Sequence, residues 1–318
     1  MDDAVGGDGS PGNGSTAMTV SSVAGTNPAR QWSGALHCTF AARRGRTELG
    51  RMRFSGPLRV QRPFHPENAA RQGFALPCHC YLLHPPGGIV SGDDLETALE
   101  VEPGAHCLAT TPAADKFYRG DGTGARQRRT SRAVVRDGVL EWLPHPVICF
   151  DGSRGELVAD FHLHGGSLLL AWDLVCLGRE AGDEPFRSGG LTLTTRVWRD
   201  DAPILQERLS LDAEGALRTN AAGLGGASVF GTFCCVGDGA SLERAKQALS
   251  PLTGPPPGAG ASPWAAGCFR VSLRGGALVG RYLGMDGGDA WDRLGRAWEI
   301  ARPVVLGLPP VRPRIWET

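Results

Sequence analysis

The chain has 318 residues, of which 41% are hydrophobic, and its 33 basic residues equal its 33 acidic ones, so that the formal net charge is zero. This equality argues against a general nucleic-acid-binding protein, which usually carries an excess of Lys and Arg. The 46 glycines and 23 prolines require many turns. Together with short apolar runs they favour an all-β fold over a helical one.

The first 28 residues are rich in Gly, Ser, Asn and Thr and nearly lack large apolar side chains. We therefore expect residues 1–28 to form a disordered tail and residues 29–318 to form a single β domain. The N-terminus carries Asp2 and Asp3 and no apolar segment, which argues against a signal peptide. No uninterrupted run of about 18 apolar residues occurs, so no membrane contact is predicted.

The nine cysteines contain no C-x-x-C pair. We interpret them as reduced, mostly buried thiols of a cytoplasmic protein. Cys78, His79 and Cys80 are consecutive. Because side chains alternate along a strand, Cys78 and Cys80 point one way and His79 the other, so the triplet cannot chelate a metal as a unit.

Strands are predicted at Trp32–Phe40 and Glu48–Phe54, joined by a hairpin at Arg43–Arg46. The next strong signal is the Pro-Pro-Gly-Gly segment Pro85–Gly88, which predicts a tight reversal between two extended strands. The polar, Gly-containing segment Asn68–Pro77 predicts an exposed loop.

Arg126–Val135 carries four arginines and is predicted as a strand with its arginines on an outer face or a sheet edge; the alternative is a surface for an acidic partner. Glu156–Leu163 and Ser167–Leu177 predict a β-hairpin around Gly165 and Gly166. Period two places His162 and His164 on one face, either as a metal-binding pair or as solvent-facing, hydrogen-bonded histidines.

Helices are predicted at Ser241–Leu249, with Ser241 as N-cap, and at Asp289–Ile300, ended by Pro303. The proline-rich tail Pro309–Thr318 predicts irregular structure across a surface. Further strands are predicted at Leu191–Trp198, Ile204–Leu211, Val229–Val236, Phe269–Leu273 and Leu278–Leu283.

No nucleotide-binding P-loop, no H-E-x-x-H and no clean G-x-S-x-G motif occurs in the chain. No complete set of metal ligands is visible either, and His84, Asp93 and Asp94 near the Cys-His-Cys triplet suggest only a transient site for a borderline metal such as nickel. The sequence therefore predicts a protein without enzyme activity.

Two runs are specific enough to point to a family: CHCYLLHPPGGIVSGD at Cys78–Asp93 and KFYR at Lys116–Arg119. With these runs the chain resembles the urease accessory proteins UreD, also called UreH, from about Trp32 to its end. Further matching segments are Gly45–Thr47, Gly56–Phe64, Thr110–Ala113, Leu140–Pro144, Arg281–Leu283 and Pro313–Trp316.

The resemblance implies an all-β fold of stacked sheets, similar to a distorted β-helix or sandwich, with about two α-helices toward the C-terminus. It implies a scaffold that binds the urease apoprotein and UreF, and UreG through UreF. It implies no tightly bound cofactor, but nickel in transit to the urease active site through an internal, water-filled passage. A conduit should hold nickel weakly, because a closed set of ligands would retain it.

Carried onto this sequence, the resemblance makes Asp93 and Glu141 candidate residues of the nickel passage, and Glu67, His79 and His84 further ones. The alternative is structural: Asp93 caps a turn and Glu141 pairs with an arginine. Family members usually have Gln-Glu after Leu-Pro, whereas this chain has His145 and Pro146, and His145 could replace the missing acidic group as a ligand.

The helix Asp289–Ile300 and the C-terminal tail are expected to contact UreF, with Trp291, Trp298 and Trp316 as candidate partner-binding residues. Trp291 and Trp298 could equally well pack on a sheet. Two other functions remain open: a carbohydrate-active enzyme of the β-helix kind, which needs paired carboxylates in an open groove, and a stable metal-binding store.

Overall fold

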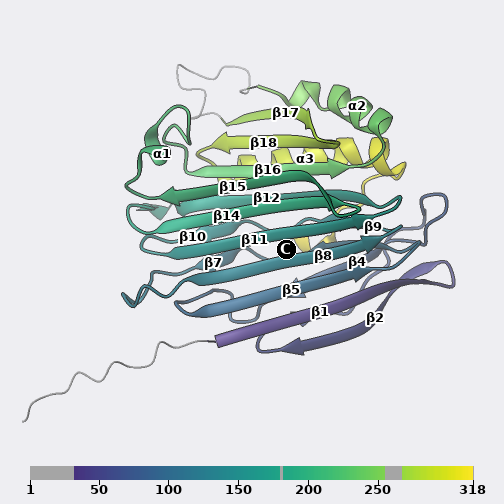
Figure 1. Cartoon of the computed structure of the whole chain (residues 1–318), viewed down its shortest axis with the longest axis horizontal. Helices are drawn as coiled ribbons and strands as arrows, with labels where there is room; N and C mark the ends of the chain where they lie inside the picture. The colour runs from purple at the N-terminus through teal and green to yellow at the C-terminus, as the bar shows by residue number, and fades with distance from the viewer. Residues whose placement is uncertain (1–31, 180–181, 255–266, 318) are drawn as a thin grey trace, which may run out of the picture.

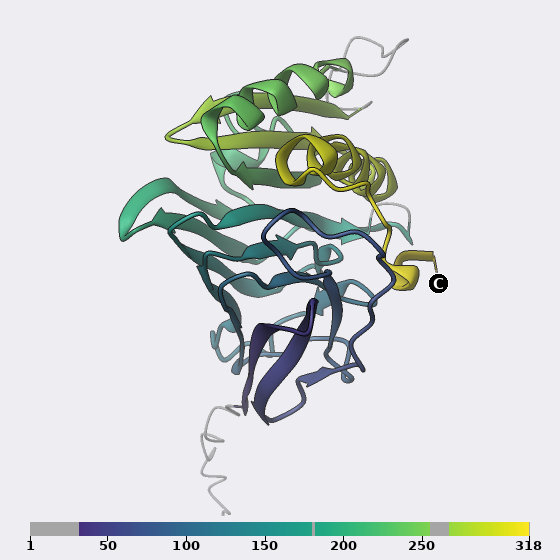
Figure 2. The same cartoon turned by 90° about the vertical axis from the view of Figure 1, so that its right-hand side faces the viewer.

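The computed structural model describes residues 32–179, 182–254 and 267–317, so the predicted tail 1–28 lies outside the described residues. The described chain consists mainly of strands, arranged as two stacked sheets with helices on one side (Figures 1 and 2). This confirms the all-β prediction. None of the described helices is long and apolar enough to cross a bilayer.

The first sheet has seven strands and is open. In spatial order they are β15 (Ala202–Asp212), β14 (Gly190–Arg199), β11 (Arg154–His164), β8 (Gln127–Arg136), β5 (Asp93–Val101), β1 (Trp32–Arg43) and β2 (Arg46–Ser55). Its two edge strands are therefore β15 and β2.

The second sheet faces the first, and its main path runs through eight strands. In order they are β17 (Cys268–Arg274), β18 (Ala277–Gly284), β16 (Val229–Val236), β12 (Leu168–Arg179), β9 (Val139–Trp142), β6 (His106–Thr110), β4 (Cys78–Leu83) and β3 (Arg59–Val60). Three short strands extend it: β10 (Val147–Cys149), which pairs with β12 and with β7 (Asp115–Phe117), and β13 (Glu184–Pro185), which pairs with β12.

In the middle of the molecule the chain winds like a β-helix, passing alternately through the two sheets; we call this winding the coil. It passes from β5 to β6, from β8 to β9 and from β11 to β12, each time leaving the first sheet for the second. Equivalent strands of successive turns pair in parallel: β8 pairs with β5 and β11, and β9 pairs with β6 and β12. The sequence shows no repeat because this coil requires only alternating buried positions, not particular residues.

The prediction of a β-hairpin around Gly165 and Gly166 was therefore wrong, since β11 and β12 belong to different sheets. The backbone at this turn bonds to neighbouring turns of the coil: Leu168 N donates to Gly138 O at 2.9 Å, and Asp200 N to Leu163 O at 3.0 Å. The reversal at Pro85–Gly88 likewise connects β4 and β5 across the two sheets. A tight turn is compatible with either connection, so its residues cannot distinguish a hairpin from a coil.

The arginine-rich strand is central rather than an edge, because β8 lies between β5 and β11. Arg128 and Arg132 are on the outer face as predicted. Arg129, one residue away from Arg128, must point the opposite way, into the space between the sheets. The hairpins β1–β2, β14–β15 and β17–β18 and the buried strand β16 confirm the sequence predictions.

Two α-helices, α2 (Gly239–Ala248) and α3 (Gly287–Leu306), cover the outer face of the second sheet, which Figure 2 shows edge-on. One apolar core fills the space between the sheets, and another lies between the second sheet and these helices. The remaining helical segments are short: α1 (Ala216–Thr219), η2 (Ser250–Leu252) and η3 (Arg314–Glu317).

Both helix boundaries differ from prediction. The N-cap of α2 is Asp238, whose carboxylate accepts a hydrogen bond from Ser241 N at 2.9 Å, so Ser241 is inside the helix. Pro303 lies inside α3, which continues to Gly307 at φ +70°. Burial of Val305 and Leu306 against the sheet stabilises this last turn and offsets the hydrogen bond that proline removes.

Two glycines with positive φ should respond differently to alanine. At Gly307 no atom lies within 4 Å of the point that a Cβ would occupy, whereas at Gly189 (φ +100°) a Cβ would lie 2.2 Å from Ser153 O. We expect Gly307→Ala to cost about 1 kcal/mol, the strain of a left-handed alanine, and Gly189→Ala to cost more than about 3 kcal/mol. Urea denaturation of both variants measures the difference, and equal losses would contradict the described packing at Gly189.

Candidate functional site

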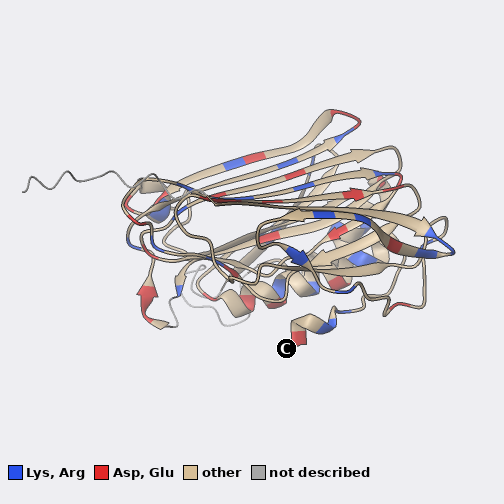
Figure 3. Cartoon of the chain, turned by 90° about the horizontal axis from the view of Figure 1, so that it is seen from below, with Lys and Arg blue, Asp and Glu red and all other residues tan. Residues whose placement is uncertain are grey.

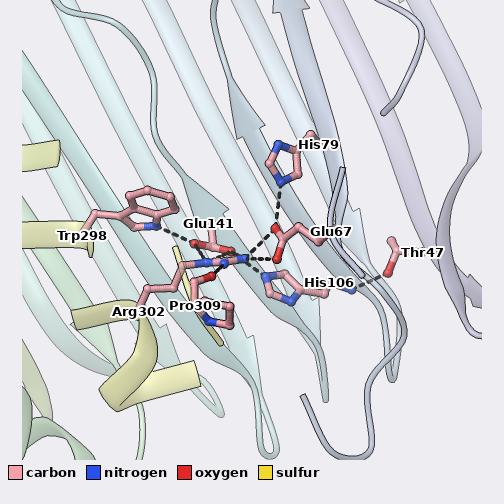
Figure 4. Close-up of polar contacts among 8 residues, drawn as sticks. All are labelled: Thr47, Glu67, His79, His106, Glu141, Trp298, Arg302 and Pro309. Atoms are coloured by element: carbon pink, nitrogen blue, oxygen red, sulfur yellow. Dashed lines mark hydrogen bonds and ion pairs between the residues drawn. The ribbon is translucent and has the colours of Figure 1, made fainter. Parts of the chain in front are cut away.

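A buried polar cluster occupies the helix-facing side of the second sheet. In β4, β6 and β9 the residues His79, Leu108 and Glu141 lie side by side in register. His106, two residues before Leu108, points to the same face, and Glu67 reaches it from the loop before β4. Figure 4 shows these side chains converging on one guanidinium group.

That guanidinium belongs to Arg302 of α3, which is fully buried. Its Nη2 donates to Glu67 Oε1 and Oε2 at 2.7 and 2.9 Å, and its Nε to Glu141 Oε1 and Oε2 at 3.1 and 3.0 Å. Nη1 donates to the carbonyl oxygen of Pro309, at the start of the C-terminal tail (Figure 4). One side chain thus joins a loop, a sheet strand, a helix and the tail.

The remaining donors complete the environment of the two carboxylates. His79 Nε2 lies 2.8 Å from Glu67 Oε1, His106 Nε2 lies 2.7 Å from Glu141 Oε1, and Trp298 Nε1 donates to Glu141 Oε2 at 2.6 Å. Because an ionised carboxylate only accepts hydrogen bonds, each imidazole must donate through Nε2. Its Nδ1 atom has no partner among the described residues.

Burial and charge act in opposite directions on Glu141. Burial alone would raise its pKa, but the Arg302 guanidinium and the hydrogen bond and charge of His106 outweigh it and hold the pKa well below its usual range. The two carboxylates raise the pKa of Arg302 against the effect of its burial. Arg302 and Glu141 therefore stabilise each other's charged form inside the protein.

This arrangement is a clamp rather than an open ligand set. A metal ion would have to displace Arg302 to reach either carboxylate, and only the Nδ1 atoms of His79 and His106 remain available as ligands. In the described part of the chain no group of three or more His, Cys, Asp and Glu is arranged to hold a metal ion. The geometry of Glu141 matches the structural alternative, a carboxylate paired with an arginine.

The other two predicted passage residues lie elsewhere. Asp93 is buried at the start of β5, where Oδ2 accepts a hydrogen bond from Val90 N at 2.9 Å, the geometry of a turn cap. His84 Nδ1 lies 3.8 Å from Asp115 Oδ1, in a cavity between the two sheets. The structure thus brings Glu67, His79 and Glu141 together and separates Asp93 and His84 from them. Contact of any of these five residues with nickel stays a prediction.

Within the described residues, three cavities follow one another between the sheets. Their volumes are about 60, 20 and 790 Å³. Arg129 lines the first and the second, and Leu193 the second and the third, so each cavity shares a lining residue with the next. Polar side chains occur along the whole series: His84, Asp115, Arg129, Ser131, His145, Asp173, Thr195, Thr232, Arg281 and Glu207.

Each of these cavities is lined by both acidic and basic side chains. Arg129 pairs with Asp115, and Arg281 Nη1 donates to Glu207 Oε2 at 2.9 Å. Burial would raise the pKa of Asp115, but Arg129 and His84 hold it below its ordinary value. Asp173 lies between these pairs, and there burial prevails: it raises the pKa of Asp173 to about 6, although Arg129 and a hydrogen bond from Thr195 oppose it.

Sequence reasoning did not select Arg302, Arg129 or Asp173, although each left a signal. Arg302 follows Trp298 by four residues and therefore lies on the apolar face of α3. Arg128 and Arg129 are neighbours in a strand, so one of them must face inward. Asp173 is the lone charge in the apolar run of β12.

The predicted partner-binding tryptophans form one aromatic cluster with Trp172. Ring centroids of Trp291 and Trp316 are 5.1 Å apart, and those of Trp298 and Trp316 are 5.6 Å apart. Trp298 is fully buried and leaves no side-chain surface for a partner, whereas Trp291 and Trp316 are half-buried. Partner contact by Trp291 and Trp316 stays a prediction. His145 stacks on Trp291 at 4.4 Å, and burial lowers its pKa.

The histidine pair of β11 and the cysteines are accounted for by local contacts. His162 and His164 share a face as predicted, and each lies near a carboxylate: His162 Nε2 is 3.4 Å from Asp160 Oδ1. All nine cysteines are free thiols, and burial raises the pKa of Cys38 and Cys78 to about 12. Such thiols are poor nucleophiles at neutral pH.

Comparison with known proteins identifies close relatives over nearly the whole chain. A family model described as UreD urease accessory protein matches residues 33–317. Proteins named urease accessory protein UreD from Alkalilimnicola ehrlichii and Pseudomonas putida are each 43% identical, and the matches cover 90% of this chain and 92% and 94% of those proteins. The one from Chromohalobacter salexigens is 39% identical, covering 91% of this chain and 90% of that protein.

The clamp should make the free energy of unfolding depend on pH. Because the folded-state pKa of Glu141 is depressed, its stabilisation is present above the ordinary pKa of 4.5 and is lost as the pH falls below it. Glu141→Gln leaves Arg302 with one carboxylate, so we expect a loss of about 3–5 kcal/mol at pH 7 that shrinks below pH 4.5. Chemical denaturation at several pH values measures both effects.

The matched control is Glu184→Gln, which removes an ion pair with Arg179 in which both side chains are about half exposed. It should cost less than about 1 kcal/mol at every pH. If Glu141→Gln cost no more than Glu184→Gln at pH 7, the clamp would not contribute to stability as described.

Proposed function

The chain belongs to the UreD family of urease accessory proteins, and from this premise we propose that it serves urease maturation as a non-catalytic scaffold for nickel insertion. The family assigns it an accessory role rather than catalysis. The partners we propose are the urease apoprotein and UreF, with UreG joining through UreF. Nickel is the cargo and not a resident cofactor.

One observation supports a transport role most directly: the series of three cavities between the two sheets, each lined in part by polar or charged side chains. A β stack of this kind needs no internal charges for stability, and buried charges cost free energy unless they are paired. Here Asp115 and Arg129, and Arg281 with Glu207, are paired along the cavities, while Asp173 has only partial compensation. We infer that these groups keep the interior hydrated and passable for a cation.

A passage for nickel requires that each group along it binds the ion only weakly. Nickel accepts nitrogen and oxygen ligands, and a cage of four would hold it too tightly for delivery. His84, Asp173 and Glu207 line three different cavities, so that these three ligands are offered singly. A stable metal store, the competing hypothesis, requires a closed ligand set, and the described residues contain no group that favours one.

The clamp has a separate part in this proposal. It fixes α3 and the start of the tail to the sheet through Arg302. Trp316 Nε1 also donates to Thr110 Oγ1 at 2.9 Å, which holds the end of the tail against the same sheet. We propose that this rigid helix–tail surface, including Trp291 and Trp316, binds UreF, because a pre-ordered surface loses less entropy on binding.

The maturation role is tested by reconstitution. Apo-urease, UreF, UreG, nickel and bicarbonate are incubated with and without the chain, and urease activity is measured. We expect activation to depend on the chain, and we expect the chain alone to hydrolyse no urea. Equal activation in its absence would contradict the proposal.

The passage is tested at Asp173. Asp173→Asn keeps the volume but removes the charge, so we expect urease activation to fall at least about tenfold if the carboxylate assists the ion. The exposed turn residue Asp201 has φ +63°, which asparagine also tolerates, so Asp201→Asn is the matched control and should activate normally. Equal activation by both variants would exclude Asp173 from the route.

The same substitution should stabilise the protein. The raised pKa of Asp173 means that its ionised form costs stability as the pH rises from 3.8 to about 6. Asp173→Asn should therefore match the wild type near pH 4 and exceed it at pH 8, as measured by chemical denaturation. A variant that is less stable at pH 8 would show that the carboxylate is fully compensated.

A further inference from the structure

The β1–β2 hairpin and the segment after it form a basic surface on an otherwise neutral protein. Seven arginines occur within residues 43–62, against the single carboxylate of Glu48, and all seven are exposed. They are Arg43, Arg44, Arg46, Arg51, Arg53, Arg59 and Arg62. Figure 3 views the molecule from the side on which β2 lies.

These arginines have no acidic partners in the described part of the chain. Ion pairs occur at many other arginines, including Arg126, Arg128 and Arg132 on and beside β8, but at none of the seven. The positive charge of this surface is therefore uncompensated within the described chain and available to an acidic partner.

The backbone of β2 is also unpaired along one side. β2 is the edge strand of the first sheet and pairs with β1. Thr47 N donates to Leu76 O at 2.9 Å, but among the described residues the backbone from Glu48 to Ser55 bonds only to β1. Eight residues of open edge span at most about 26 Å, the length of an ordinary strand, with one β-bulge between Leu49 and Met52.

Two large apolar side chains lie along this edge. Met52 and Phe54 are opposite Cys38 and Leu36 and so point to the core side of the sheet. They are nevertheless 41% and 49% exposed, because the second sheet ends at the short strand β3 and does not cover them. The Arg59 guanidinium lies 4.1 Å from the centroid of the Phe54 ring.

Charge on an edge strand can serve simply to prevent unwanted pairing. That role explains the arginines but not the exposure of Met52 and Phe54 between them, since exposed apolar residues on an edge favour association. A second copy of β2 would bring arginine against arginine, so self-pairing is disfavoured. A polyanion such as nucleic acid would use the charge but neither the open backbone nor the two apolar side chains.

We propose that the open edge of β2 is a docking site for an acidic segment of a protein partner, which adds to the first sheet as an extra strand. The free N–H and C=O groups from Glu48 to Ser55 would pair with its backbone. Its acidic side chains would meet the arginines, and its apolar side chains, at alternate positions, would extend the core over Met52 and Phe54.

The test uses a labelled eight-residue peptide of alternating glutamate and valine and the full-length chain, with binding followed by fluorescence anisotropy. We expect Arg51→Glu with Arg53→Glu, and separately Met52→Ser with Phe54→Ser, to weaken binding at least about tenfold. The matched control, Arg136→Glu with Arg274→Glu, changes two exposed arginines elsewhere that form no ion pair with a described residue, and it should bind as the wild type does.

Two further probes distinguish strand addition from attraction of any anion. A peptide of alternating glutamate and glycine has the same charge without apolar side chains, and an eight-nucleotide single-stranded DNA has more charge; both should bind at least about tenfold more weakly. Equal binding by either probe, equal binding by the edge variants and the control, or no binding of the first peptide would overturn the proposal.

Hydrogen exchange on the unmodified chain gives a test that does not depend on variants. Binding of the glutamate–valine peptide should slow exchange of amides between Glu48 and Ser55, because strand addition occupies their free N–H groups. Unchanged exchange along β2 in the bound state would show that the peptide binds elsewhere and would overturn the assignment to this edge.

Discussion

The burial of one arginine governs how the parts of this protein are held together. A guanidinium removed from water is tolerated only when anionic groups compensate it at short distance, and Arg302 is fully buried between Glu67 and Glu141. These two carboxylates come from a loop and from the second sheet, while Arg302 comes from the C-terminal helix. The charge can be compensated only when all three elements are in place, so the clamp makes the position of α3 and the tail a condition of the fold.

Buried charges between the two sheets must also be compensated, but there they are not gathered into one cluster. There the charges are spread along a line of cavities, and acidic and basic groups compensate one another in pairs such as Asp115 with Arg129. Asp173 is the least compensated of them, which its raised pKa reflects. A compact, fully paired cluster makes a rigid joint, whereas a dispersed series leaves room for water and for an ion in passage, as our proposal requires.

The surfaces proposed for partners lie on different parts of this framework. The helix–tail surface is attached to the second sheet by the clamp, and the open β2 edge belongs to the first sheet. The cavities with their charged lining residues lie between these two sheets. In a scaffold that guides an ion between proteins, binding surfaces on both layers of the stack would place the partners around the interior route without any reactive centre in the chain itself.

From the amino-acid sequence we could predict the all-β class, most strand positions, the opposite orientation of His79 to Cys78 and Cys80, and the family. Alternating apolar residues, turn residues and local motifs are all properties of short segments. The family resemblance also selected Glu67, His79 and Glu141 as passage candidates, together with Asp93 and His84, which the structure places elsewhere. Three features could be seen only in the folded structure: Arg302 closes Glu67 and Glu141 into a clamp, Arg129 and Asp173 line cavities between the sheets, and β11 and β12 belong to different sheets. Each of these depends on which segments meet across the coil, and a turn or a lone buried charge does not specify its distant partner.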